Sequence, residues 1–220
     1  MEWRFETMPN DTRRALDYVS KEQWLSRDGW YLAGGTALAL QAGHRQSVDL
    51  DFFTQKKTFP PTQVIEHFPE TNEKIWKATI VQEGTIYGAI CGAKVSFIAY
   101  PFFVPVVRKH TYGGVEILDK DDIAVMKIIA ISQRGRKRDF LDLYWYVNHV
   151  APLISVMEKL PRQYPTVAHN FHHIIKSLTY FEEAESDPMP TLLFDATWED
   201  IKKYFRTEVP RLAKKMLHLE

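Results

Sequence analysis

Two carboxylates stand two positions apart in the apolar stretch SVDLDFF. Alternate side chains of a β-strand point to opposite faces, so Asp49 and Asp51 share one face. We expect Val48, Leu50 and Phe52 on the opposite, buried face. Two like charges about 7 Å apart along a strand repel each other unless a cation lies between them. The pair therefore predicts a bound divalent cation such as Mg²⁺.

A glycine pair precedes the carboxylates in the stretch YLAGGTALAL. We predict that a strand ends at Gly34 and Gly35 and that a helix begins near Thr36. Glycines let a ligand approach the backbone closely, and the unpaired N–H groups at the start of a helix bind phosphate. Taken alone, a glycine pair before a helix is more often only a tight turn. Together with the aspartates, it predicts a site for a nucleoside triphosphate (NTP) with Mg²⁺.

Lys127 lies in the stretch DIAVMKIIAIS, which predicts a mostly apolar helix. A lysine at such a position either extends to solvent or pairs with an anion. Replacing it by methionine is expected to weaken NTP binding, because the ammonium is lost, and to leave stability nearly unchanged, because methionine keeps the apolar stem. Asp139 and Asp142 are three residues apart in the next predicted helix and share one face. These two carboxylates either cap that helix at its N-terminus or take part in the site.

Four cations occur within five residues in the run RGRKR. Such runs are usually solvated loops, but next to a triphosphate site they also fit an RNA backbone. Arg45 and Ser47, just before the aspartates, have similar alternatives: a surface position, or a contact with phosphate oxygens. The candidate RNA-binding residues of the run are Arg134, Arg136, Lys137 and Arg138.

Composition narrows the class of protein. The chain has 220 residues, of which 45% are hydrophobic, enough for a substantial core. Its 28 basic and 28 acidic residues cancel, so net charge predicts no partner and any nucleic-acid signal is local. The single cysteine, Cys91, excludes an internal disulfide and suits a reducing cytosol. We find neither a signal peptide nor a membrane span, and we expect a cytoplasmic protein with no membrane partner.

The pattern of elements predicts an α/β fold (α+β) in two parts: an α/β part at residues 1–118 and a helical part at residues 119–220. In the first part we expect a helix from about residue 10, then the strand and helix around the glycine pair, then the strand with the aspartates. Residues 60–75 have a helical pattern, and three strands punctuated by glycines follow them. In the second part, a helix begins at about Asp121 and stops before Gly135, and further helices follow.

Four segments together resemble the AbiEii and AbiGii nucleotidyltransferase toxins of bacterial toxin–antitoxin and phage-defence systems. They are GGTALALQAGHRQSVDLDFF, AKVSFIAYPF, DIAVMKIIAISQRGRKRDFLDLYWYV and SLTYFEEAESDPMP, in the right order. The resemblance implies a polymerase-β-like core with a small mixed sheet. It implies transfer of a nucleotide (NMP) from an NTP with Mg²⁺ or Mn²⁺ to an RNA or protein hydroxyl. Related MenT-type members use tRNA 3′ ends, and a cognate antitoxin is the implied protein partner.

Roles of individual residues also follow from the resemblance. Asp49 and Asp51 are expected to hold the metal and to serve catalysis. Lys127 matches the helix lysine of the family, and Asp139 is expected to face the active site, where it orients Lys127 or binds the incoming base. The nucleotide-binding candidates are Gly34, Gly35, Thr36, Arg45 and Ser47.

One position departs from the polymerase-β-like pattern. Such active sites commonly have a third carboxylate on a neighbouring strand, which serves as general base for the attacking hydroxyl. In the strand KVSFIAY, the corresponding outward position is Ser96, and a serine cannot do that. Either transfer proceeds with two carboxylates, or the chain is a catalytically weak module that binds NTP. A scaffold whose aspartates are structural is a third reading.

Overall fold

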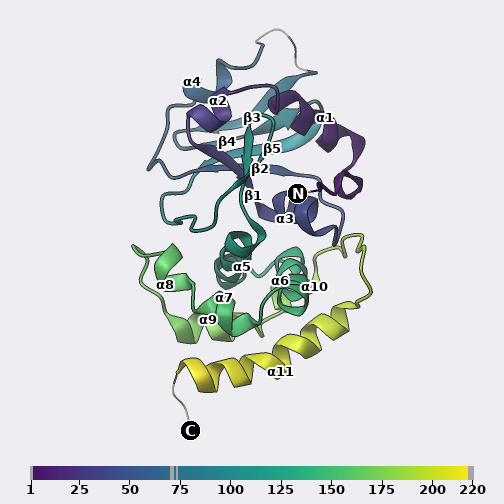
Figure 1. Ribbon diagram of the computed structural model, residues 1–220, viewed down its shortest axis with the longest axis vertical. Helices are drawn as coiled ribbons and strands as arrows, with labels where there is room; N and C mark the ends of the chain where they lie inside the picture. Colours follow the sequence, from purple (N-terminus) through teal and green to yellow (C-terminus); the bar gives the residue numbers. More distant parts are fainter. Residues whose placement is uncertain (1, 70–71, 73, 218–220) are drawn as a thin grey trace.

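The computed structural model describes residues 2–69, 72 and 74–217, which contain a seven-stranded mixed sheet (Figure 1). The strand order is β3-β4-β5-β2-β1-β7-β6. β2 pairs in parallel with β5 and β1 in parallel with β7, while the other neighbours are antiparallel. The strands are β1 (Trp30–Ala33), β2 (Leu50–Thr54), β3 (Trp76–Gln82), β4 (Thr85–Ile90), β5 (Ala93–Ala99), β6 (His110–Tyr112) and β7 (Val115–Ile117).

Aromatic side chains fill one face of this sheet. Phe52 stacks on Phe97 with ring centroids 5.1 Å apart, and Trp30 meets Phe97 edge-on at 5.3 Å. Trp24 of α2 (Trp24–Arg27) packs on the same cluster. Helices α1 (Asn10–Val19) and α4 (Thr62–Ile65) lie nearby (Figure 1). A short 3₁₀ helix at Phe5–Thr7 precedes α1. Because side chains alternate along a strand, Asp51 lies on the other face of β2. That face of the sheet is directed toward α3 (Gly34–Ala42) and the helical part.

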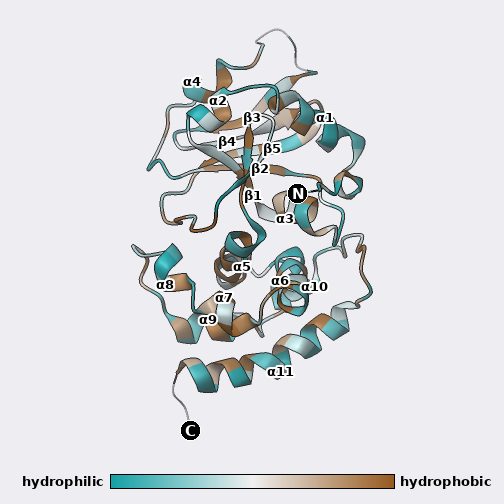
Figure 2. Ribbon diagram, viewed as in Figure 1, coloured by the Kyte–Doolittle hydropathy of each residue, from teal (hydrophilic) through white to brown (hydrophobic). Residues whose placement is uncertain are grey.

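The helical part lies beneath the sheet in Figure 1. Helix α5 (Lys120–Arg134) packs against α3 and against α6 (Lys137–His149). The ribbon of α11 alternates between hydrophilic and hydrophobic bands in Figure 2, and its apolar residues Ile201, Phe205 and Val209 are buried. Buried residues of both parts form one hydrophobic cluster. The remaining elements are α7 (Leu153–Met157), α8 (Leu160–Gln163), α9 (Phe171–Ser177), α10 (Glu182–Glu185) and α11 (Trp198–Met216).

Most predicted elements are present, with two corrections. The long helix is confirmed: the Asp119 side chain caps α5, and Gly135 ends it with a left-handed φ of 48°. Within the described part of 60–75, however, only Thr62–Ile65 is helical. Val48 is also not part of the buried face, because β2 begins at Leu50 and the Val48 side chain is half exposed. Among the helices of the described residues, none is long and apolar enough to cross a membrane.

Candidate active site

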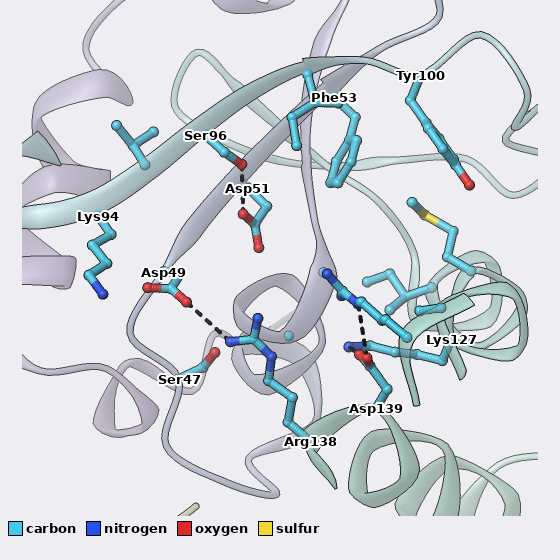
Figure 3. A pocket seen from close by; sticks show the side chains of 18 of the residues that line it. Ser47, Asp49, Asp51, Phe53, Lys94, Ser96, Tyr100, Lys127, Arg138 and Asp139 are labelled. Carbon is cyan, nitrogen blue, oxygen red and sulfur yellow. Dashed lines mark hydrogen bonds and ion pairs between the residues drawn. The ribbon is translucent and has the colours of Figure 1, made fainter. Parts of the chain in front are cut away.

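A cavity of about 420 Å³ lies between the sheet and the helical part, and the predicted residues line it from both sides (Figure 3). One end is polar, with carboxylates, a serine and basic side chains. The other end is apolar, with side chains from β2, the end of β5 and α5. Its polar end includes Ser47, Asp49, Asp51, Lys94, Ser96 and Arg138, and its apolar end includes Phe53, Ile98, Tyr100, Ile123, Met126 and Ala130.

Asp51 lies on β2 and Asp49 directly precedes that strand, and both side chains project into this cavity (Figure 3). Asp51 is opposite Ser96 in the parallel pairing of β2 with β5, and the Ser96 hydroxyl donates a 2.6 Å hydrogen bond to it. Ser96 thus lies beside the aspartate pair, as the sequence predicted. Burial raises the pKa of Asp51, and the neighbouring charge of Asp49 raises that pKa further. The Asp49 carboxylate accepts a 3.2 Å hydrogen bond from Arg138.

These carboxylates fit a hard divalent cation. Within the described residues, no group of three or more histidine, cysteine, aspartate or glutamate side chains is arranged to hold a metal. Mg²⁺ is commonly held by one or two carboxylates, with water and substrate phosphates completing its oxygen ligands. Asp49 and Asp51 supply that donor set at the polar end of the cavity. Burial raises the pKa of Asp51 although the charges of Arg138 and Lys127 lower it, and a bound cation would favour the ionised form of this carboxylate.

The glycine pair lies next to the aspartates, and the chain itself requires both glycines. Gly34 has a left-handed φ of 72°, and a Cβ there would lie 3.0 Å from the Asp51 carboxylate. A Cβ on Gly35 would lie 2.2 Å from the Arg45 guanidinium. The Thr36 hydroxyl lies 2.9 Å from the Ser47 hydroxyl and also contacts the carbonyl oxygen of Asp49. The hydroxyl of Thr36 therefore braces the turn, and it is not part of the cavity wall described above.

Lys127 pairs with anions, as one of the two alternatives predicted. Its ammonium lies 2.7 Å from Asp139 and 2.6 Å from Asp142, and both carboxylates are completely buried. The Arg45 guanidinium also binds Asp142, at 2.6 and 3.0 Å. Burial works against the charge of Asp142, but the cations of Arg45 and Lys127 hold its pKa well below the usual range. Neither aspartate caps α6, because both are buried in this ion-pair cluster.

The cluster joins the two parts of the chain and fixes Arg45. His44 adds a 2.7 Å hydrogen bond to Asp142, and burial lowers the pKa of His44. The guanidinium of Arg45 also donates to the carbonyl oxygen of Gln46, and its side chain is only 4% exposed. A contact between Arg45 and phosphate stays a prediction. The guanidinium would have to reach the phosphate while it keeps its hydrogen bonds to Asp142.

Each cation of the basic run has a partner, and Arg136 and Lys137 share Asp187. Arg134 pairs with Asp139 at 3.3 Å, and Arg136 with Asp187 at 2.8 Å. Lys137 is buried and donates to the carbonyl oxygens of Glu185 and Asp187. Arg138 reaches Asp49. The side chains of the three arginines remain 55%, 52% and 48% exposed in sequence order, so they are available to a ligand, whereas Lys137 is structural.

Sequence reasoning missed two residues of this site, Lys94 and Tyr100, and the central position of a third, Asp142. Lys94 lines the cavity two residues before Ser96 on β5. Because alternate residues of a strand share a face, the position of Ser96 could have predicted that of Lys94. Tyr100 lies at the apolar end beyond the same strand. The sequence suggests Asp142 only as a helix cap or site residue together with Asp139. In the structure it is the centre of the buried ion-pair cluster, where it binds His44, Arg45 and Lys127. Its partners come from the loop after α3 and from α5, which no sequence spacing reveals.

Two solved structures have the same overall fold. One is a protein assigned as a nucleotidyltransferase from H. pylori, with a TM-score of 0.53, 16% identity, and coverage of 96% of this chain and 99% of the other. The second is MenT4, a nucleotidyltransferase toxin from Mycobacterium tuberculosis H37Rv, with a TM-score of 0.52, 14% identity, and coverage of 93% and 89%. The fold is therefore that of a nucleotidyltransferase.

The sequence defines the family. The profile described as "Nucleotidyl transferase AbiEii toxin, Type IV TA system" matches residues 22–216. An uncharacterized protein of Aquifex aeolicus is 33% identical over 183 residues, which are 82% of this chain and 86% of the relative. This chain belongs to the AbiEii family of nucleotidyltransferase toxins, and the predicted resemblance is confirmed. Membership implies an NTP substrate and an antitoxin partner.

Proposed function

We propose that the protein transfers an NMP from an NTP to a hydroxyl of an RNA, such as a tRNA 3′ end, with Mg²⁺ or Mn²⁺ held by Asp49 and Asp51. One observation carries this proposal. The two carboxylates project into a cavity of about 420 Å³ directly beside the turn that begins α3. Carboxylates next to free helix N–H groups form a site for a metal-bound phosphate chain.

The two ends of the cavity match the two ends of an NTP. The triphosphate would lie at the polar end, between the glycine turn and Lys94. The base would lie against Phe53 and Tyr100, whose ring centroids are 5.8 Å apart, with Met126 from α5 opposite them. Base–aromatic stacking favours this pose, and it accepts any base because every base has a π face. The cavity size is within the range usual for small-molecule sites.

The transfer itself forms one bond and breaks another. The acceptor oxygen attacks the α-phosphorus, the bond from that phosphorus to the pyrophosphate oxygen breaks, and the hydroxyl proton is released. A cation on Asp49 and Asp51 supplies positive charge to the phosphate oxygens when it is bound. Because the third strand position is Ser96, the chain offers no carboxylate there to take the proton. We therefore assign that proton to solvent and expect a modest rate.

Incubation with α-³²P-labelled NTPs, Mg²⁺ and total RNA tests the proposal. We expect label to enter RNA, to depend on the metal, and to be lost when Asp49 and Asp51 are both replaced by asparagine. Label in protein instead of RNA would move the acceptor to a protein hydroxyl. Absence of label from every fraction, for all four NTPs, would contradict the transfer.

Ser96 favours a second candidate function, a catalytically weak module that binds NTP. A thermal-shift titration with NTP and Mg²⁺ separates the two. A ligand that binds the folded state stabilises it in proportion to ln(1 + [L]/Kd), whether or not transfer follows. Stabilisation by NTP without label transfer would support this second candidate. If NTP neither stabilises the protein nor transfers label, the aspartates have a structural role.

A further inference from the structure

A second cavity, of about 490 Å³, adjoins the candidate active site. Asp49 and Arg138 belong to the walls of both cavities. The rest of the second wall includes Arg136 and the segment 187–191. It is partly apolar, because the side chains of Val48 and Met189 are 50% and 43% exposed there.

Arg138 lies at the boundary between the two cavities. Its guanidinium donates to the Asp49 carboxylate at 3.2 Å, on the side of the first cavity (Figure 3). The side chain is 48% exposed, and exposed ion pairs of this kind contribute little to stability. A change of rotamer would therefore release it from Asp49 at small cost.

A cation at the aspartate pair and the Arg138 guanidinium would compete for one carboxylate. Both are positively charged and both bind Asp49, so each disfavours the other at short range. The neighbouring Arg136 has no such conflict, because its partner is Asp187 at 2.8 Å in the second cavity.

We propose that Arg138 couples the two cavities: it holds Asp49 when the metal is absent, and it turns into the second cavity to bind the acceptor when metal and NTP occupy the first. This inference rests on the proposed function. It makes nucleotide binding favour acceptor binding, because the same guanidinium serves both sites in turn. Linkage then requires that the acceptor also favour the nucleotide, by the same factor.

The acceptor in the second cavity is the end of a single-stranded polynucleotide. Two half-exposed guanidiniums, those of Arg136 and Arg138, match backbone phosphates. The exposed Val48 and Met189 side chains, with Pro188 and Pro190, offer apolar surface to bases. The cavity shares Asp49 with the nucleotide site, so an acceptor hydroxyl placed there would be next to the reacting phosphate.

Mn²⁺ binding to the nucleotide-free protein, measured by electron paramagnetic resonance, tests the first position of Arg138. Removing a competing cation should strengthen binding, so Arg138→Gln should bind Mn²⁺ up to about fivefold more tightly, the ratio that corresponds to an exposed ion pair of about 1 kcal/mol. Arg136→Gln is the matched control and should bind Mn²⁺ as the wild type does. Unchanged or weaker Mn²⁺ binding by Arg138→Gln would overturn the competition.

The affinity for a 5′-fluorescein-labelled single-stranded oligoribonucleotide tests the second position. It is measured with and without Mg²⁺ and a non-hydrolysable α,β-methylene NTP. We expect the nucleotide analogue to raise RNA affinity severalfold in the wild type. Arg136→Gln should weaken RNA binding in both conditions and keep that ratio, whereas Arg138→Gln should bring the ratio to about one.

The outcomes separate this inference from the function on which it rests. If the wild type does not bind the analogue with Mg²⁺, the proposed function fails. If it binds analogue and RNA independently, or if both variants lose the ratio equally, the coupling by Arg138 fails and the transferase proposal stands. If no RNA binds and a protein is labelled instead, the assigned occupant of the second cavity is wrong.

Discussion

Asp49 and Asp51 have different surroundings although they share one strand face. Replacing either by asparagine should reduce NMP transfer about 100-fold or more, because several kcal/mol of transition-state stabilisation depend on the cation they hold. Without Mg²⁺, the melting temperature should be retained. Asparagine at 51 still accepts the Ser96 hydrogen bond and removes a buried charge, and the Asp49 pair with Arg138 is exposed. Steady-state transfer and thermal melting are the measurements.

Asp11→Asn is the control for these variants. Asp11 forms an exposed pair with Arg14 on α1, outside both cavities. It should lose neither transfer nor stability. A marked fall in the melting temperature of an Asp49 or Asp51 variant in the absence of metal would make those carboxylates structural.

Lys127 is the residue for which the structure changes a prediction. The expectation that Lys127→Met leaves stability nearly unchanged assumed that the ammonium meets the NTP or solvent and has no partner within the protein. The ammonium is instead buried between two carboxylates, so its loss leaves these buried charges with only Arg45 and the half-exposed Arg134 as cationic partners. We expect a loss of about 3–5 kcal/mol in the free energy of unfolding by urea. Lys159→Met, which breaks a one-third-exposed pair with Asp121, should cost about 1 kcal/mol or less, and equal costs would refute the distinction.

Asp142 gives the stability a defined pH dependence. Its pKa is held well below the unfolded value of 3.8, so its ionised form stabilises the fold fully above about pH 4. That contribution is lost as the pH falls through the folded-state pKa, because the unfolded chain takes up the proton first. Asp142→Asn should be less stable than the wild type at pH 7 and should show a flatter decline below pH 4. Urea unfolding over a pH series measures both, and parallel curves would contradict the assignment.

The element that sets the geometry is the joint between α5 and α6. Gly135 ends α5 with φ of 48°, and an added Cβ there would make only ordinary van der Waals contacts, with the nearest atom 3.7 Å away. The cost of a side chain there is therefore backbone strain alone. Gly135→Ala should lose about 1–2 kcal/mol of unfolding free energy. Gly135→Asn should lose less, because asparagine tolerates the left-handed region, and the reverse order would show that another contact decides.

Across the whole molecule, the sheet and the helical part depend on each other. The buried pairs between Arg45 of the first part and Asp142 of the second, together with one shared hydrophobic cluster, cross the predicted boundary at residue 118. We expect the chain to unfold as one cooperative unit. Hydrogen exchange of peptides from β2 and from α6, followed at increasing urea, should report the same global free energy. A separate earlier transition for either part would show independent domains.

The sequence alone predicted what local patterns decide. Strand alternation paired Asp49 with Asp51 and identified Ser96 as the residue beside them, and an aspartate cap and a terminal glycine delimited α5. Four segments in order predicted the family. The helical pattern at 60–75 predicted a longer helix than the Thr62–Ile65 turn that forms. Short apolar runs do not reveal which part of a segment packs against the rest of the chain.

Only the tertiary structure decided the long-range pairings. Arg45 and Asp142 are 97 residues apart, and their contact removes from solvent a cation that local sequence could only describe as a surface or phosphate-binding residue. Likewise, the partners of the basic run come from the residue before β2, from α6 and from the segment around Asp187. The sequence shows that a cation in such a place needs an anionic partner. The fold determines which anion it meets, because the distance between two charges depends on the path of the whole chain.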